Sequence, residues 1–383
     1  MTRAYWGFSR FCTNHYSRNN CSMTTEEKRH TMFVGIDVHK DTHTAVGVSP
    51  FGEKLFEITV GNYEKDFLSL SERIREVGST SVLSPFVGLE DCSGFGERLA
   101  LYLHEDGYRL VHVPPVLVDR DRKRQTHPEK SDSLDALGVA KVMLASSDTL
   151  PVYTVSENSK NAKILKELSH DRDFLVSERT RLKNQVHILL HRIYNTEYRT
   201  YFKDPFSLKA LRHWAKVRPQ CDEHVLRTLK RKVRRLLDIR TEIQELEKDM
   251  EAVMEKRAYT LDTASGCGTV LAASIIGEIG DIDRFKSPAA LAKYAGCAPR
   301  SHSSGKTERH RKTRSGNRKL NRSLHRMALS QISRSGNDAA KKYFEKKISE
   351  GKSKSQALVC LRRHMVNVVY MMLKHNEEYR QPA

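Results

Sequence analysis

Short apolar runs separated by turn residues characterise the first part of the chain, from about residue 32 to 150. Their lengths and spacing predict five strands, with helices between some of them. The expected strands span 32–38, 44–48, 54–60, 81–89 and 109–113, and the expected helices span about 63–76, 95–105 and 132–146. The first three strands form a predicted antiparallel meander, and strand–helix alternation follows.

This order of elements predicts an α/β domain with an RNase H-like (RuvC-like) sheet. A doubly wound parallel sheet is the competing fold. It predicts a glycine-rich phosphate-binding turn after the first strand, and the sequence has none there. The first strand ends instead at a carboxylate, Asp37.

Apolar residues recur every seven positions in two charged stretches between about 157 and 258. A sustained seven-residue period predicts long coiled-coil helices. The two series are Leu168, Leu175, Leu182 and Leu189, and then Leu229, Leu236, Ile243 and Met250. The pattern breaks near Pro205 and Pro219, which indicates a smaller insert between two long helices. We expect the seam to join different chains slightly in preference to forming a bundle within one chain.

The composition changes again after residue 259. Gly266 and Gly268 precede a small-residue helix, a pattern that resembles a helix–hairpin–helix DNA-backbone binder, although a turn with no ligand fits it almost as well. Ten lysines and arginines then lie in 300–326, against one acid, Glu308. A further helix is expected at about 353–375.

We therefore divide the chain into four segments. These are a flexible N-terminal extension (1–31), the α/β domain (32–150), a helical coiled-coil domain (151–258) and a mostly helical C-terminal domain (259–383). Met23 and Met32 are alternative natural starts between which the sequence does not choose.

Charge and cysteine content narrow the class of partner. The chain has 66 Lys and Arg against 47 Asp and Glu, a net charge of +19, which favours a polyanionic partner such as nucleic acid. Its 7 cysteines are scattered without a CxxC pair, which excludes zinc-ribbon motifs and is typical of a cytoplasmic protein. No apolar run reaches the roughly 18 residues that a membrane span needs, so we expect no membrane partner.

Four carboxylates stand at the ends of predicted elements. Asp37 ends the first strand and Glu90 the fourth, and these strands lie side by side in an RNase H-like sheet. Asp132 and Asp135 lie three apart at a helix start, on one helical face. Converging carboxylates repel one another unless a cation lies among them, and oxygen ligands select Mg²⁺ or Mn²⁺. Each acid alone also fits an ordinary cap or turn. His39 and His43 are assigned no role, and Asp91 is expected to point to the opposite side.

The motifs together resemble a known family. "VGIDVHKDTH", "GLEDCSGFGERLALYLHEDGYRL", "KSDSLDALGVAKVM", "GCGTVLAASIIGEIGDIDRFKSPAALAKYAGCAPRSHSSGK" and "SGNRKLNRSLHRMAL" occur in this order between about 32 and 335. In this order they resemble the DEDD transposases of bacterial insertion sequences. That class is related to the Piv DNA invertases and is also called the bridge-RNA-guided recombinases. One departure is "DCSG" after Glu90, where Thr-Gly is usual.

The resemblance implies a set of functional residues. Asp37, Glu90, Asp132 and Asp135 match the four metal-binding acids, and Ser304 matches the nucleophilic serine. Ser303 stays open as an alternative nucleophile, with Ser301 less favoured. Arg300, Lys306 and Arg309 lie close enough in sequence to neutralise charge on a phosphate. The nucleic-acid-binding set comprises Arg300, Lys306, Arg309, Arg311, Lys312, Arg314, Arg318, Lys319 and Arg322.

The resemblance also implies an activity and partners. The chain is expected to be an RNA-guided DNA recombinase that uses Mg²⁺ (or Mn²⁺) and forms a covalent phosphoserine. Its expected partners are donor and target double-stranded DNA, a structured noncoding guide RNA and further copies of itself, from a dimer to a tetramer. Its expected location is the bacterial cytoplasm, in association with the nucleoid.

Two other functions remain open. The first is a RuvC-like metal-dependent nuclease that cuts DNA junctions with activated water and forms no covalent intermediate. The second is a basic DNA-binding protein that has lost catalysis, against which the four intact acids argue. The "SSG" segment separates the first two functions, because a hydrolytic nuclease does not need it.

Overall fold

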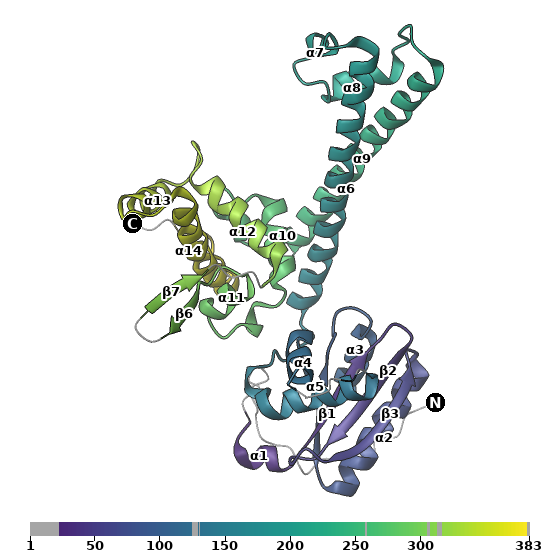
Figure 1. Ribbon diagram of the computed structural model, residues 1–383, viewed down its shortest axis with the longest axis vertical. Coiled ribbons are helices and arrows are strands. Elements are labelled where there is room, and N and C mark those ends of the chain that lie inside the picture. The colour runs from purple at the N-terminus through teal and green to yellow at the C-terminus, as the bar shows by residue number, and fades with distance from the viewer. Residues whose placement is uncertain are drawn as a thin grey trace. The chain divides into compact units, whose positions relative to one another are not determined.

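The computed structural model of the 383-residue chain describes residues 23–124, 129, 131–256, 259–304, 307–311 and 316–380, with backbone alone for 300–304 and 307–311. It separates into two compact units after Ser156, and each unit is described by itself (Figure 1). The expected boundary at 150/151 lies close to this division, and the expected boundary at 258/259 falls inside the second unit.

A five-stranded sheet forms the centre of the first unit, with the strand order β3-β2-β1-β4-β5. β1 pairs antiparallel with β2 and parallel with β4, so the meander and the parallel part meet at β1. The first and fourth strands are therefore neighbours, as expected. The strands are β1 Thr31–Val38, β2 Thr42–Val48, β3 Lys54–Gly61, β4 Ser84–Leu89 and β5 Arg109–His112.

Helices cover both faces of this sheet. Alternate residues of β1 explain the layers, because successive side chains of a strand point to opposite faces. Met32, Val34 and Ile36 pack with the helices α2 and α3, whereas Phe33 packs with α4 and α5. The helices of this unit are α1 Thr25–Arg29, α2 Glu64–Ser81, α3 Glu97–Glu105, α4 Pro115–Arg122 and α5 Asp132–Ser146, with the 3-10 helix η1 Ser147–Thr149.

Residues 24–31 correct one expectation. The sequence analysis placed them in a flexible extension, but Thr24 forms a capping box at the start of α1 and Thr31 begins β1. The capping box satisfies backbone N–H groups that a helix start leaves free, which fixes this short helix. The rest of the expected extension, 1–22, lies outside the described residues.

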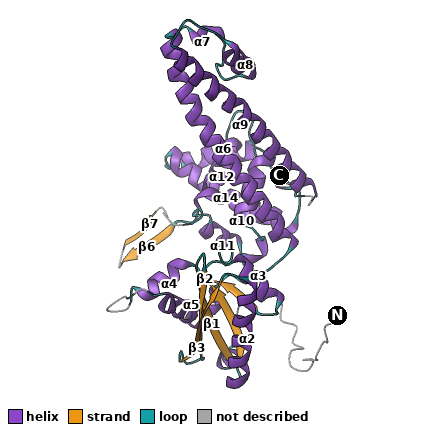
Figure 2. Ribbon diagram, turned by 90° about the vertical axis from the view of Figure 1, so that its right-hand side faces the viewer, coloured by secondary structure: helices purple, strands orange, loops and turns teal. Residues whose placement is uncertain are grey.

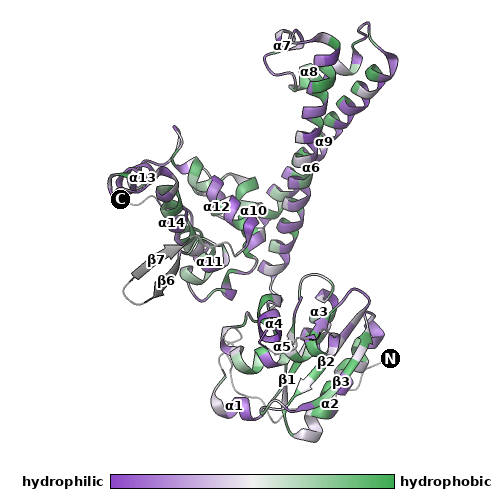
Figure 3. Ribbon diagram, viewed as in Figure 1, coloured by the Kyte–Doolittle hydropathy of each residue, from purple (hydrophilic) through white to green (hydrophobic). Residues whose placement is uncertain are grey.

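Two long helices begin the second unit, α6 Glu157–Tyr194 and α9 Glu223–Lys256. Residues of the two heptad series pack together within the chain: Leu175 and Ile243 share one cluster, and Leu182 and Leu189 pack against another that contains Leu229 and Leu236. Figure 3 shows hydrophobic and hydrophilic residues alternating along both helices. The seam that we expected between chains is therefore formed between two helices of one chain.

A small insert covers the end of this helical pair at which α6 ends and α9 begins, here called the distal end. The breaks in the heptads predicted such an insert. It contains α7 Tyr198–Tyr201 and α8 Leu208–Lys216. Trp214 of α8 is fully buried in a cluster with Leu190 of α6 and Leu229 of α9. The insert is therefore an ordered part of the second unit.

The remaining elements build a helical domain around the proximal end of α6 and α9. Its core includes Ala162 and Leu165 of α6 and Met250 and Met254 of α9. The elements are α10 Thr269–Ile279, α11 Pro288–Tyr294, α12 Arg318–Gln331, α13 Asp338–Ser349 and α14 Lys354–His375, the 3-10 helices η2 Leu261–Thr263 and η3 Ile282–Arg284, and the strands β6 Arg300–Ser304 and β7 Thr307–Arg311.

Two features of this domain bear on the sequence analysis. The helix expected at 353–375 is α14, which starts at the capping box of Ser353. The β6–β7 hairpin, visible in Figure 2, was not predicted. Across the described residues, none of the helices combines the length and the apolar character needed to cross a membrane.

Gly35 allows β1 to lie directly against α5. A Cβ atom at this position would overlap the carbonyl oxygen of Ala136 and the amide nitrogen of Ala140, which are backbone atoms of α5. The backbone of a packed helix cannot move aside locally, so this glycine sets how closely the start of α5 approaches the end of β1.

We predict that Gly35→Ala destabilises the first unit by at least about 3 kcal/mol, because overpacking against backbone is not relieved by side-chain rotation. Gly107→Ala is the control. Its φ of +92° is strained for alanine, but a Cβ atom added at Gly107 would meet no atom of a non-adjacent residue within 4 Å. This substitution should therefore cost only about 1–2 kcal/mol. Differential scanning calorimetry measures both, and equal losses would contradict the close approach.

Candidate metal centre and serine hairpin

Asp37 is a buried carboxylate at the end of the central strand. It is the seventh residue of β1 and is 4% exposed. It shares the parity of Phe33 and Gly35, so its side chain lies on the α5 face of the sheet. The fold therefore buries a charged group where it meets the first turn of α5.

Glu90 follows the last residue of β4 and continues the pairing with β1. Its amide donates to the carbonyl of Ile36, and Ile36 pairs with Leu89. Glu90 is thus beside Asp37, and the Asp37 carboxylate is among the groups that raise the pKa of Glu90. The prediction that these two strand ends bring their acids together is confirmed.

Asp132 and Asp135 belong to the first turn of α5, which starts with Ser131 as its N-cap. Carboxylates are favoured at a helix N-terminus by the helix dipole. Asp132 is exposed, whereas Asp135 is largely covered and lies 3.3 Å from the guanidinium of Arg122. Arg122 belongs to α4, which the sequence analysis did not predict, so this cation was missed.

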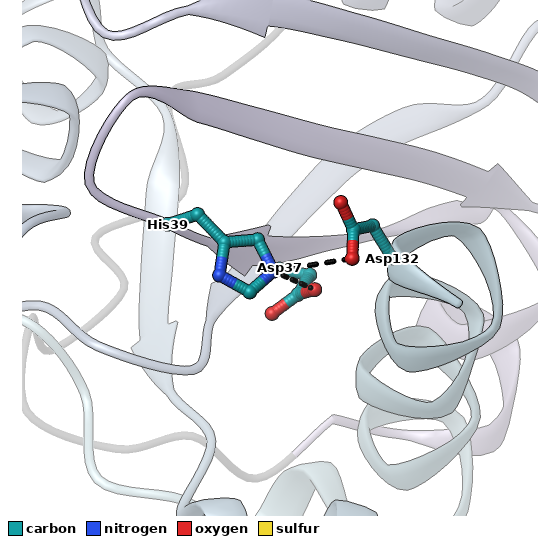
Figure 4. A group of neighbouring side chains, drawn as sticks. All are labelled: Asp37, His39 and Asp132. Atoms are coloured by element: carbon teal, nitrogen blue, oxygen red, sulfur yellow. Dashed lines mark ion pairs between the residues drawn. The ribbon is translucent and has the colours of Figure 1, made fainter. Parts of the chain in front are cut away.

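His39 is a second residue that the sequence reasoning missed. Its Nε2 atom lies 3.0 Å from Asp37 Oδ2 and 3.3 Å from Asp132 Oδ1, between the two carboxylates (Figure 4). The available signal was its spacing: His39 is two residues beyond Asp37, and residues two apart on a strand share a face. The sequence analysis assigns His39 no role because histidines at such positions are more often surface or turn residues than ligands.

The protonation of the site reflects its burial. Burial raises the pKa of Glu90 to about 7, and the neighbouring Asp37 is the next cause. Burial also raises the pKa of Asp37, an effect that His39 opposes and that Asp135 and Asp132 reinforce. The pKa values of Asp37 and Glu90 are therefore both raised, because two buried carboxylates resist being charged together.

The donor set fits a divalent cation. Ligand atoms of Asp37, His39 and Asp132 lie within 4.8 Å of one another. Asp37 Oδ2 is buried and makes no well-directed hydrogen bond within the described parts of the chain. A carboxylate oxygen left in this way, beside further acids, is the environment that Mg²⁺ or Mn²⁺ satisfies. Glu90 and Asp135 lie next to this group without being part of its closest set.

Asp91 has a separate, structural role. Its carboxylate accepts hydrogen bonds from the amides of Ser93, Gly94 and Phe95 at 2.9–3.1 Å. It therefore organises the "DCSG" turn that leads into α3. The unusual turn sequence carries its own cap.

Ser304 lies in the second unit, at the end of β6. The hairpin register pairs Ser304 with Thr307, Ser303 with Glu308 and Ser301 with His310. Ser304 is thus the last residue of β6, and the serine-rich segment, for which the sequence analysis predicted no element, is a strand. Because the acids belong to the first unit, the site and the hairpin are described separately.

The two ends of the hairpin segment are fastened together at its base. The Asn317 amide donates to the Tyr294 carbonyl at 2.7 Å, and the Asn317 side chain donates to Glu278 at 2.6 Å and caps α12. Asn321 donates to the carbonyls of Ala295 and Gly296. These bonds join the end of α11 to the start of α12, so the hairpin emerges from a fixed base.

Glu278 connects this base to the long helix α6. It is 6% exposed and accepts a 2.6 Å hydrogen bond from His170 of α6. Burial acts to raise the pKa of Glu278, but the hydrogen bonds from His170 and Asn317 outweigh it and hold the pKa below its ordinary value. The carboxylate is therefore kept ionised inside the protein.

The expected nucleic-acid-binding residues fall into three groups. Arg300, Arg309 and Arg311 lie in the strands of the hairpin, whereas Lys306, Lys312 and Arg314 lie outside the described residues. Arg318, Lys319 and Arg322 occupy the first turns of α12. Arg322 also pairs with Asp173 of α6 at 3.4 Å, so part of its charge is already compensated.

Comparison with known proteins agrees with this arrangement. A transposase model of the DEDD class from IS110 elements matches residues 34–195, and a model described as "Transposase IS116/IS110/IS902 family" matches residues 258–345. These matches place the chain in the class of transposases, which are enzymes that cut and transfer DNA.

Similar whole proteins narrow this class. The chain is 28% identical to the insertion element IS116 uncharacterized 44.8 kDa protein of Streptomyces clavuligerus, over 92% of this chain and 96% of that protein. It is 23% identical to the pilin gene-inverting protein of Moraxella lacunata (91% and 97% covered). It is also 23% identical to the transposase for insertion sequence element IS1111A of Coxiella burnetii (91% and 91%). The chain belongs to the IS110 family of insertion-sequence transposases.

We predict that Asp37→Asn lowers the affinity for Mn²⁺ more than about tenfold, since even outer-shell changes cost 10–100-fold at metal sites. Without metal the variant should be at least as stable as wild type, because one source of repulsion is gone. Isothermal titration calorimetry measures the affinity. Asp41→Asn, an exposed acid in the β1–β2 turn, is the control, and a similar loss in both variants would place the cation elsewhere.

We predict that Glu278→Gln lowers the unfolding free energy of the second unit by about 1–3 kcal/mol at pH 7, through loss of a charge-assisted hydrogen bond. Because the pKa of Glu278 is lower in the folded state than in the unfolded state, where it is 4.5, its ionisation stabilises the folded protein at pH values above 4.5. This contribution disappears as the pH falls through the folded-state pKa. The difference between variant and wild type should therefore shrink below pH 4.5. Denaturant titration followed by Trp214 fluorescence measures it.

The control for this change is Glu255→Gln, an exposed acid near the end of α9. It should leave the unfolding free energy within about 0.5 kcal/mol of wild type at every pH. A Glu278→Gln difference that stayed constant down to acidic pH would contradict an ionised Glu278.

Proposed function

We propose that the chain is an RNA-guided DNA recombinase that cuts and rejoins strands through a covalent phosphoserine. The observation that carries the proposal is the convergence of Asp37, Glu90, Asp132 and Asp135 at one edge of the sheet. The strand order and the position of these acids support an RNase H-like, RuvC-like first unit. The acids would serve as the metal-binding and catalytic set.

In this proposal each acid has a task at the scissile phosphate. Asp37 and Asp132, with Glu90 and Asp135 beside them, would hold Mg²⁺ or Mn²⁺. When bound, such an ion polarises a phosphoryl oxygen and lowers the pKa of a coordinated hydroxyl. Arg122 would keep Asp135 oriented toward the site. His39, whose Nε2 lies 3.0 Å from Asp37 and 3.3 Å from Asp132, would help to hold both carboxylates in place.

Ser304 is the proposed nucleophile. Its Oγ would form a bond to phosphorus as its proton is removed, and the bridging oxygen of the cut DNA strand would leave and be protonated. The phosphoserine keeps the energy of the broken bond, so a hydroxyl of another strand can displace the serine without ATP. Arg300 and Arg309, on the same hairpin, would neutralise charge on the phosphate. The fixed base formed by Asn317 supports this role, since catalysis depends on a well-held nucleophile.

We propose that the acids of one copy of the chain meet Ser304 of another copy. This arrangement needs several copies, which would form a dimer that assembles into a tetramer. The heptad seam is used within the chain, so assembly would require another surface. Phe174 and Ile188 of α6 are 63% and 68% exposed and lie two heptads apart, on one face. They support contact between copies at this face.

The remaining partners are nucleic acids. The turn at Gly266, which has φ of +71°, precedes α10, whose Gly268 N-cap offers no side-chain cap. The first amides of α10 could take a phosphate in a helix–hairpin–helix manner. A structured noncoding RNA would pair with donor and target DNA and choose the site, within the bacterial cytoplasm at the nucleoid.

We predict that wild type, given its guide RNA, DNA and Mg²⁺, forms a covalent protein–DNA adduct that survives denaturation, and that Ser304→Ala reduces the adduct at least about 1,000-fold, as expected for loss of a nucleophile. Ser303→Ala, the adjacent hydroxyl, is the control and should retain the adduct. Denaturing gel electrophoresis of labelled DNA measures both.

Two results would count against the proposal. An adduct that persists in Ser304→Ala and disappears in Ser303→Ala would move the nucleophile by one residue. Cleavage by wild type without any attachment to DNA would replace the recombinase with a hydrolytic nuclease.

A further inference from the structure

Positive charge is concentrated at the distal end of the α6–α9 helical pair. Residues 179–240, which form this end, contain 17 Lys and Arg against 5 Asp and Glu, a net charge of +12 out of +19 for the whole chain. The proximal parts of the same helices, 157–178 and 241–256, contain 6 Lys and Arg against 11 Asp and Glu, a net charge of −5. A surface that only confers solubility mixes both signs, so this separation of charge points to a binding partner of negative charge.

The short helix α8 carries the best-defined part of this surface. Its residues Ala210, Leu211 and Trp214 are buried against the helical pair. Lys209, Arg212 and Lys216 follow helical spacing on the opposite side and are exposed. The apolar side thus fixes the helix in place and holds three cations outward in a row.

Within the described residues, Lys209, Arg212 and Lys216 make no ion pair with an acid. This differs from the proximal part of the helical pair, where Arg172 lies 2.7 Å from Glu247. Unpaired cations in a fixed row are suited to a row of phosphates, since each phosphate contact releases counterions and strengthens binding.

The aromatic residues of this end argue against recognition of single strands. Tyr198, Phe206 and Trp214 are buried in its core, so they present no face on which a base could stack. Tyr201 is 51% exposed, but its ring is stacked on His213. Single-stranded nucleic acids are held largely by stacking on exposed aromatic rings, whereas a duplex presents only its backbone and grooves.

We propose that the outward face of α8, formed by Lys209, Arg212 and Lys216, binds the phosphate backbone of duplex DNA. Because transposases act on DNA, we assign this face to a DNA duplex and not to an RNA duplex. From Leu165, in the core of the C-terminal domain, to Leu190, beside α8, helix α6 rises about 38 Å, at ~1.5 Å per residue. The α8 contact therefore lies about one turn of B-DNA, ~34–36 Å, away from that domain. It anchors DNA flanking the exchange point, independently of which residue is the nucleophile.

The test is a binding assay with the full chain in the absence of divalent metal, so that the probes stay intact. Lys209→Gln/Arg212→Gln/Lys216→Gln should bind a labelled mixed-sequence DNA duplex about 10–100-fold more weakly near 0.1 M salt. The slope of log affinity against log salt should become shallower by about 2–3, because each lost phosphate contact contributes ~0.9. Fluorescence anisotropy across a salt series measures both quantities.

Two matched variants complete the test. Lys28→Gln/Lys65→Gln/Arg73→Gln removes two lysines and one arginine from α1 and α2 and should change neither quantity much. Lys209→Arg/Arg212→Lys/Lys216→Arg keeps the charge of α8 and should retain affinity. Unchanged Trp214 fluorescence verifies that the end of the helical pair is folded, because this residue lies on the buried side of α8.

The result that overturns the proposal is equal DNA affinity and salt slope in the α8 triple variant and the α1–α2 control. An RNA duplex and a single-stranded DNA of the same sequence are tested in parallel. A loss confined to the RNA duplex would assign the face to RNA, and a loss confined to single strands would show that backbone spacing in a duplex is not what it recognises. Either outcome would also overturn the assignment to duplex DNA.

Discussion

The burial of the Asp37 carboxylate is the interaction on which the first unit depends. A charged group that is 4% exposed is unfavourable unless its charge is compensated, and three further acids adjoin it. Three features of the structure reduce this cost: the raised pKa of Glu90 beside Asp37, the imidazole of His39 between Asp37 and Asp132, and the pairing of Asp135 with Arg122. All three are weaker substitutes for a divalent cation, which would interact with several carboxylates at once. The site is thus built at a cost in stability that cation binding would recover.

The same constraint explains why the surrounding fold is tightly packed. Asp37 is placed on the central strand, where pairing on both sides leaves its backbone no freedom to move. Gly35 brings α5 against this strand, and the N-cap Ser131 starts α5 so that Asp132 lies at its first position. Preorganised charge acts well only if its supports are rigid. The second unit repeats this logic with a different group, since Glu278 holds the base of the serine hairpin through Asn317 and fastens it to α6 through His170.

Much of the first unit could be predicted from the sequence. Its strands are bounded by turn residues, and their order places the ends of β1 and β4 together, so Asp37, Glu90 and the start of α5 follow from local pattern. Two features of this unit, and one of the second unit, did not follow. His39 was assigned no role because histidines in such positions are more often surface or turn residues than ligands, and its place between two acids depends on tertiary contacts. The short helix α4, and with it Arg122, has little periodicity. The β6–β7 hairpin was missed because a serine-rich, basic segment lacks the apolar alternation that indicates a strand.

The second unit shows a similar limit. The heptads predicted long helices, but a seven-residue period is the same for helices that pair within a chain and between chains. Pairing within the chain depends on the connection that lets α9 run back along α6. The seven-residue period contains no information about that connection. The His170–Glu278 contact joins residues 108 positions apart and the Asn317–Glu278 contact residues 39 apart, and each residue alone resembles an ordinary cap or surface side chain. The Ser304 assignment rests on family membership together with its place at the end of β6.

The most direct test of the central claim is anomalous diffraction from crystals of the protein grown with Mn²⁺. The account predicts a strong anomalous peak within coordination distance of the carboxylates of Asp37 and Asp132, with Glu90 and Asp135 turned toward it. Its occupancy should be lost in crystals treated with a chelator. A well-ordered sheet edge with no peak there, or a peak bound only by acids elsewhere on the chain, would contradict the claim that these four residues form one metal centre.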